Sequence, residues 1–172
     1  MVETELPAAS TSASAERREL FRASVEMALY IALSLLGVMV ALPLVMERTE
    51  AYSVAATLFV TAVGLLAAHW LAFGVSSRLE TGGILSREAL EELAAQVTGG
   101  AIAVAIAVVP LLLLPPPSGL LVAQLGLLAL IAGVAYEAAR PRAGSRTRAL
   151  AYTGAIVIAA AIVVALHDFG EH

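Results

Sequence analysis

Residues 51–75, AYSVAATLFVTAVGLLAAHWLAFGV, decide the fold, because this stretch contains no acidic residue, lysine or arginine. About 20 helical residues cross a bilayer core that is about 30 Å thick. Backbone amides in hydrocarbon have no water to bond, so a spanning segment of this kind must satisfy its own hydrogen bonds as an α-helix. The stretch therefore predicts a transmembrane helix.

The composition of the whole chain agrees with this prediction. Of its 172 residues, 60% are apolar and 14% are charged, and the mean hydropathy is +0.89. A soluble domain is about 45–50% apolar and about 25% charged. Cysteine is absent, which excludes a disulfide framework and thiolate ligands. We expect an all-α, polytopic membrane protein without a metal or cofactor.

Four further apolar runs are long enough to cross the membrane, and turn-forming residues separate them. We therefore expect a bundle of five transmembrane helices within residues 25–172, joined by short loops and preceded by a polar tail and juxtamembrane helix at 1–24. The expected spans are 25–46, 51–75, 98–114, 119–136 and 149–166.

A short amphipathic segment precedes the third span. In residues 86–97, SREALEELAAQV, apolar residues recur at helical spacing, the acidic residues lie opposite them, and Ser86 is a suitable N-cap. Two interpretations are open: a helix lying on the membrane surface, or a cytosolic extension of the third span interrupted at Gly99–Gly100. Surface helices that bind anionic lipid carry basic residues, so the acidic face favours the extension or packing against another protein.

Arginine distribution predicts the orientation. Five spans place nine of the ten basic residues on one side, and Arg48 alone on the other. Because positive charge is retained in the cytoplasm, we expect a cytoplasmic N-terminus and an outside C-terminus. The absence of lysine and the abundance of alanine indicate a GC-rich bacterial genome, hence a bacterial inner membrane. A net charge of −4 without a basic face argues against nucleic acid as a partner.

Ionisable side chains at membrane depth are the candidates for function. His69 lies in an otherwise uncharged helix, and imidazole is the side chain whose ordinary charge change falls near neutral pH. Glu26, Tyr30 and Ser34 form one helical stripe that could line a cation pathway entered from the cytosol. The alternatives are a neutral imidazole bonded to a neighbouring helix, and a packing stripe in which Glu26 pairs with Arg22.

Small residues at intervals of three or four predict close helix packing. On this basis a homo-oligomer is expected, because the second span carries small residues on two faces. We also expect Gln124 to make a hydrogen bond between helices. The predicted packing positions are Gly37, Gly64, Gly99, Ala103, Gly126 and Gly133.

Two functions follow from these patterns. The first is a small channel or transporter for protons or another small cation, with His69 in the pathway. The alternative is a non-transporting accessory or scaffold protein, whose charged loops bind a cytoplasmic protein. The sequence contains no nucleotide-binding or hydrolase motif, so an enzyme is not expected.

Overall fold

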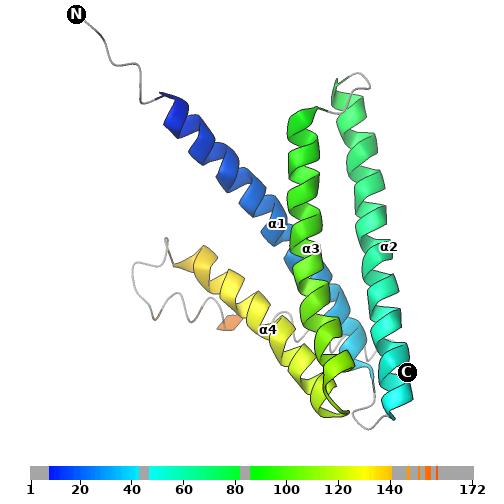
Figure 1. Cartoon of the computed structure of the whole chain (residues 1–172). Helices are drawn as coiled ribbons and strands as arrows, with labels where there is room; N and C mark the ends of the chain where they lie inside the picture. The colour runs from blue at the N-terminus through cyan, green and yellow to red at the C-terminus, as the bar shows by residue number, and fades with distance from the viewer. Residues whose placement is uncertain are drawn as a thin grey trace, which may run out of the picture.

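The computed structural model describes residues 8–42, 47–81 and 86–140, together with the single positions 147, 151, 154, 155 and 158. Within these residues the chain forms four helices, which follow one another as antiparallel hairpins (Figure 1). The helices are α1 (Ala8–Val40), α2 (Arg48–Thr81), α3 (Arg87–Leu113) and α4 (Ser118–Ala139).

Each of the four helices is long and apolar enough to cross a membrane. The expectation of an all-α protein with membrane-length helices is therefore confirmed. The structure shows four such helices where the sequence predicts five. The expected fifth span, 149–166, lies outside the described residues apart from Ala151, Gly154, Ala155 and Ile158, each of which is helical.

Two helices extend further than the apolar runs. Helix α1 begins at Ala8, within the segment 1–24 for which a polar tail and a juxtamembrane helix are expected, because the Ala, Glu and Arg residues of this segment are good helix formers. Helix α3 begins at Arg87 and continues through Gly99–Gly100 without interruption, with Ser86 as its N-cap accepting the Ala89 N–H at 3.1 Å. Of the two interpretations of residues 86–97, the structure therefore shows the helical extension.

The long helices exceed the thickness of a bilayer. At 1.5 Å per residue, α1 and α2 are each about 50 Å long and α3 is about 40 Å long. The end of α1, the start of α2, the end of α3 and the start of α4 lie at one end of the bundle (Figure 1). We call the opposite end the arginine-rich end: it holds the starts of α1 and α3 and the ends of α2 and α4. Its exposed arginines are Arg17, Arg18, Arg22, Arg78, Arg87 and Arg140.

Helix α3 is the centre of the bundle and contacts all three other helices. Two adjacent glycines make this packing close. A Cβ atom on Gly99 would overlap the backbone carbonyl of Ser24 in α1, and a Cβ on Gly100 would lie 2.7 Å from Leu66 Cδ2 in α2. The Gly–Gly pair thus presents one face to α1 and another to α2.

Small residues continue these faces along each helix. In α3, Ala103 and Ala107 follow Gly99 at intervals of four and are fully buried. In α1, Ala28 and Ala32 follow Ser24 at the same interval and are also buried. Small side chains every four residues allow helix backbones to approach closely in a membrane. The α1–α3 crossing rests on this pairing of small residues.

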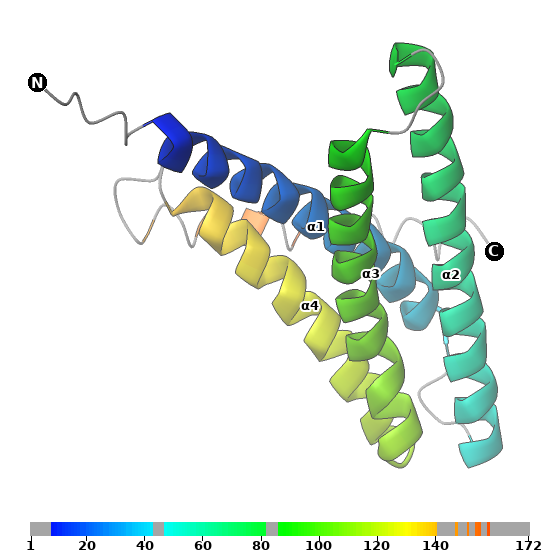
Figure 2. The ribbon, with the colours of Figure 1, turned by 45° about the horizontal axis from the view of Figure 1, so that its top comes forward.

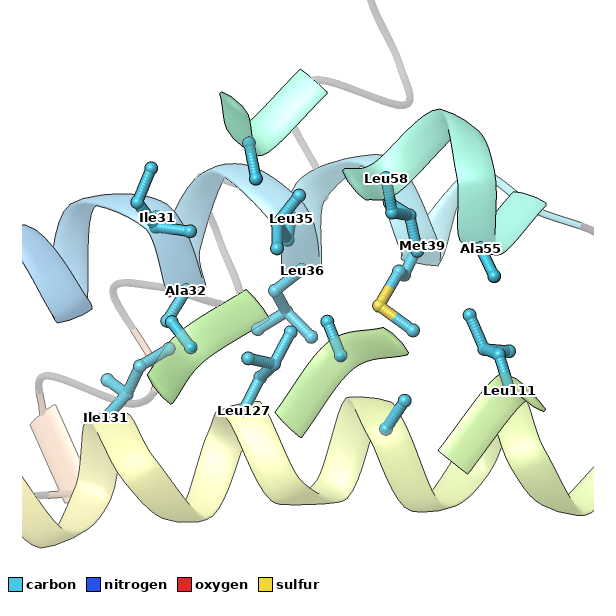
Figure 3. Close-up of a cluster of buried hydrophobic side chains, with 14 of the residues drawn as sticks. Ile31, Ala32, Leu35, Leu36, Met39, Ala55, Leu58, Leu111, Leu127 and Ile131 are labelled. Atoms are coloured by element: carbon cyan, nitrogen blue, oxygen red, sulfur yellow. The ribbon is translucent and has the colours of Figure 1, made fainter. Parts of the chain in front are cut away.

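The larger apolar side chains fill the opposite end of the bundle, where all four helices meet. Leu35 and Met39 of α1, Leu58 of α2 and Leu127 of α4 are completely buried in one cluster (Figure 3). Away from this cluster the helices diverge, with α1 and α4 leaning one way and α2 and α3 the other (Figures 1 and 2).

A polar contact joins α4 to α1 beside the cluster. Gln124 Nε2 donates to the backbone carbonyl of Met39 at 2.9 Å. Met39 lies in the last turn of α1, where carbonyl groups have no partner within the helix. This is the interhelical hydrogen bond expected for Gln124, and the same carbonyl also accepts the Leu42 N–H at 3.4 Å.

The glycine contact generates a stability prediction. Gly99→Ala places a methyl group against the Ser24 backbone, which cannot move as a side-chain end can, so we expect the variant to lose about 1–3 kcal/mol of unfolding free energy. Gly64→Ala is the matched control on another helix, because no atom lies within 4 Å of a Cβ at Gly64. Equilibrium unfolding of the purified protein in detergent measures both. Equal stability of the two variants would contradict the close approach of α1 to α3.

Candidate functional site

His69 lies on the half of α2 that faces its neighbours. It follows Ala55 and Ala62 at intervals of seven, and both alanines are buried. The His69 side chain is half-buried, and its Nε2 atom is inaccessible to solvent and has no hydrogen-bond partner among the described residues. A buried ring nitrogen without a partner costs free energy, so it requires an explanation.

Gln96 of α3 also has a buried polar atom without a hydrogen-bond partner in the ranges that the structure describes. Its side chain is only 8% exposed, and it is the one polar residue in the buried class among the described part of the chain. Its Oε1 atom has no hydrogen-bond partner within the described residues. In the sequence, residue 96 stands out only as part of the amphipathic segment 86–97. The signal that could have found it is its spacing, three residues before Gly99 on the same small-residue face as Ala103.

Helix geometry places Gln96 and His69 at one level of the α2–α3 hairpin. The contact between Gly100 and Leu66 fixes the register of the two antiparallel helices. Gln96 lies one turn before Gly100, and His69 lies one turn after Leu66, so both residues are displaced from the contact toward the arginine-rich end. Successive residues are rotated by about 100° around a helix axis. Gln96 therefore projects from α3 within about 60° of the direction of Gly100, and His69 projects from α2 within about 60° of the direction of Leu66. The two buried, unpaired polar atoms therefore belong to one region between α2 and α3.

The other predicted pathway residues lie elsewhere. Glu26 and Tyr30 are exposed on the outer face of α1, with Tyr30 48% exposed, and Ser34 is half-buried beside them. The Ser34 hydroxyl donates to the Tyr30 carbonyl at 2.8 Å, within its own helix. Glu26 is about 200° around α1 from Ser24, which contacts α3. Within one chain the structure thus does not bring this stripe together with His69.

The predicted packing residues divide into two groups. Gly99, Ala103 and Gly126 lie at helix contacts, and a Cβ on Gly126 would lie 2.7 Å from Ile106 of α3. For Gly37, Gly64 and Gly133, no atom lies within 4 Å of such a Cβ. Gly64 and Gly133 are exposed and Gly37 is half-buried, and none of the three makes a close helix contact within the described part of the chain. The stripe Ser24–Ala28–Ala32 lies on the buried side of α1, where Ser24 meets Gly99 of α3. It was not predicted, because the polar stripe that begins at Glu26 lies on the opposite face of α1.

A shallow hollow of about 230 Å³ lies between α1 and α2 near the turn that joins them. Its polar lining consists of Glu50, Ser53 and Thr57. Two of the three side chains already make a hydrogen bond: Glu50 Oε2 accepts the Glu47 N–H at 2.8 Å, and the Thr57 hydroxyl donates to the Ser53 carbonyl at 2.9 Å.

The charged extension of α3 is exposed at the arginine-rich end. Arg87 Nε and Glu91 Oε1 are 2.8 Å apart, one helical turn from each other, and the Arg87 side chain is 91% exposed. An exposed pair of this type contributes little to stability. Across residues 8–42, 47–81 and 86–140, no group of three or more His, Asp or Glu side chains could hold a metal ion. This end of the bundle is a solvated, charged surface.

Comparison with known proteins adds no relative: no family model matches the chain, and no curated protein or solved structure shows significant similarity to it. The candidate site therefore rests on the geometry of this chain alone.

Proposed function

We propose that the chain is a multi-pass protein of a bacterial inner membrane that conducts protons or another small cation, with His69 as the titrating group. The observation that carries the proposal is the buried, unpaired Nε2 atom of His69 in a helix that is otherwise without ionisable residues from Tyr52 to Arg78. An ionisable group at this depth is costly unless it has a function. Imidazole can accept and release a proton near neutral pH.

The proposed topology has five spans, with 149–166 as the fifth, a cytoplasmic N-terminus and an outside C-terminus. In it, the arginine-rich end faces the cytoplasm, in agreement with the retention of positive charge on that side. The protein is proposed to act as a homo-oligomer in the lipid bilayer, without a cofactor, an enzymatic activity or a nucleic-acid partner.

Oligomerisation gives the stripe of Glu26, Tyr30 and Ser34 a role. The stripe lies on the outer face of α1, where a second copy of the chain could cover it. In the proposed mechanism the stripe lines the cytoplasmic entrance between copies, with Glu26 as the acidic residue at the mouth. Gly37 and Gly64, at which a Cβ would meet no atom within 4 Å, would then support contacts between copies rather than within one chain.

A second candidate function is a scaffold that binds a cytoplasmic protein. It is supported by the length of α1 and α3, which continue well beyond a bilayer core and expose charge of both signs at the arginine-rich end. Glu88 and Glu91 on α3 and Arg17 and Arg18 on α1 would be the contact residues.

Proton flux into proteoliposomes tests the first function. We expect His69→Ala to reduce pH-driven flux at least tenfold, because no other imidazole lies in the described helices, and Glu26→Ala to reduce it less. Gln124→Leu is the control, since Gln124 is a half-buried amide that bonds to Met39 and lies outside the proposed path. Unchanged flux in both His69→Ala and Glu26→Ala would show that the mechanism is wrong.

Cross-linking in cells tests the second function. A photoreactive amino acid at Glu88 should capture a protein other than this chain, whereas the same group at Val122, on the apolar exposed face of α4, should not. Capture of further copies of this chain alone from position 88 would count against the scaffold.

A further inference from the structure

We infer that His69 and Gln96 form a single site that holds one water molecule between the imidazole and the amide, and that this site makes the proton the transported species. The second half of the inference rests on the proposed function, whereas the water site does not. Neither residue alone indicates such a site. The inference comes from two unpaired polar atoms buried at the same level between the same two helices.

A shared water explains why both atoms lack a partner in the protein. His69 Nε2 and Gln96 Oε1 are each inaccessible, and neither donates to nor accepts from any described residue. A water molecule carries two donors and two acceptors, so one molecule can satisfy an imidazole nitrogen and a carbonyl oxygen together. Burying two polar atoms without such a bridge is unfavourable in an apolar bundle.

The same two ligands argue against a metal cation at this position. Calcium is held by six to eight oxygen ligands and zinc by four nitrogen, oxygen or sulfur ligands. The site offers one ring nitrogen and one amide oxygen, and no group of three or more His, Asp or Glu side chains that could hold a metal ion lies in the described part of the chain. A proton needs no such shell, because it passes along a hydrogen bond from water to imidazole.

Gln96 is therefore a positioning residue for the water that contacts His69. The surroundings make this assignment specific. Leu93 and Gly99 on the same face of α3 are buried, and Leu66 closes the site on the side of Gly100. An apolar side chain at position 96 would leave the water with His69 alone, and a water needs two or more polar partners to be retained.

Nuclear magnetic resonance of the full chain in lipid, with ¹⁵N-labelled histidine, tests the site without any transport measurement. The probe is water itself, through magnetisation transfer from water protons to His69 Nε2. We expect a cross-peak in the wild type and at least a fivefold loss of its intensity in Gln96→Leu. Gln124→Leu is the matched control, because it removes a half-buried amide from α4 and should leave the cross-peak unchanged.

A second measurement keeps the inference falsifiable if Gln96→Leu fails to fold. In the wild type, the side-chain amide protons of Gln96 should show transfer from the same water resonance. Absence of the His69 cross-peak in the wild type, absence of the Gln96 transfer, or an unchanged cross-peak in Gln96→Leu would each overturn the site. A retained water signal without proton flux would refute the proposed function and leave the water site standing.

Discussion

The contacts made at Gly99–Gly100 are the constraint on which the structure depends. A methyl group on Gly99 would overlap the Ser24 backbone of α1, so only hydrogen fits there without a shift of the backbone, whereas a methyl group on Gly100 would press on the end of the Leu66 side chain of α2. In a bilayer, lipid solvates apolar side chains as well as protein does, so van der Waals contact rather than hydrophobic burial holds helices together. The helices therefore gain most where small residues let them touch, and α3 becomes their common neighbour.

The position of the polar site follows from this constraint. The register of α2 against α3 is fixed where Leu66 packs on Gly100, and that register brings His69 level with Gln96. Both lie toward the arginine-rich end from that contact, the end at which α1 and α4 lean away from α2 and α3 (Figures 1 and 2). The apolar cluster of Leu35, Met39 and Leu127 closes the opposite end. The bundle thus has one tightly packed apolar end and one diverging end that carries charge.

Much of the fold could be predicted from the sequence, and for identifiable reasons. Uninterrupted apolar runs mark helices, prolines and charges mark turns, and Ser86 marks the start of α3. The packing face of α3 was also visible in the Gly99–Ala103 interval. The face of α1 was not, because Glu26 and Ser24 both look polar in the sequence, and only contact with Gly99 shows which side is inside. Gln96 was missed for the same reason, since burial of an amide depends on the partner helix and not on its own neighbours.

A double-mutant cycle at the α2–α3 contact tests the central claim most directly. Gly100→Leu should destabilise the protein, and Leu66→Ala should make room for the new side chain. We predict that the double variant is more stable than the sum of the two single effects by about 1–2 kcal/mol in unfolding free energy, as expected for residues in contact. Additivity within about 0.5 kcal/mol would contradict the register of α2 on α3, and with it the level at which His69 and Gln96 meet.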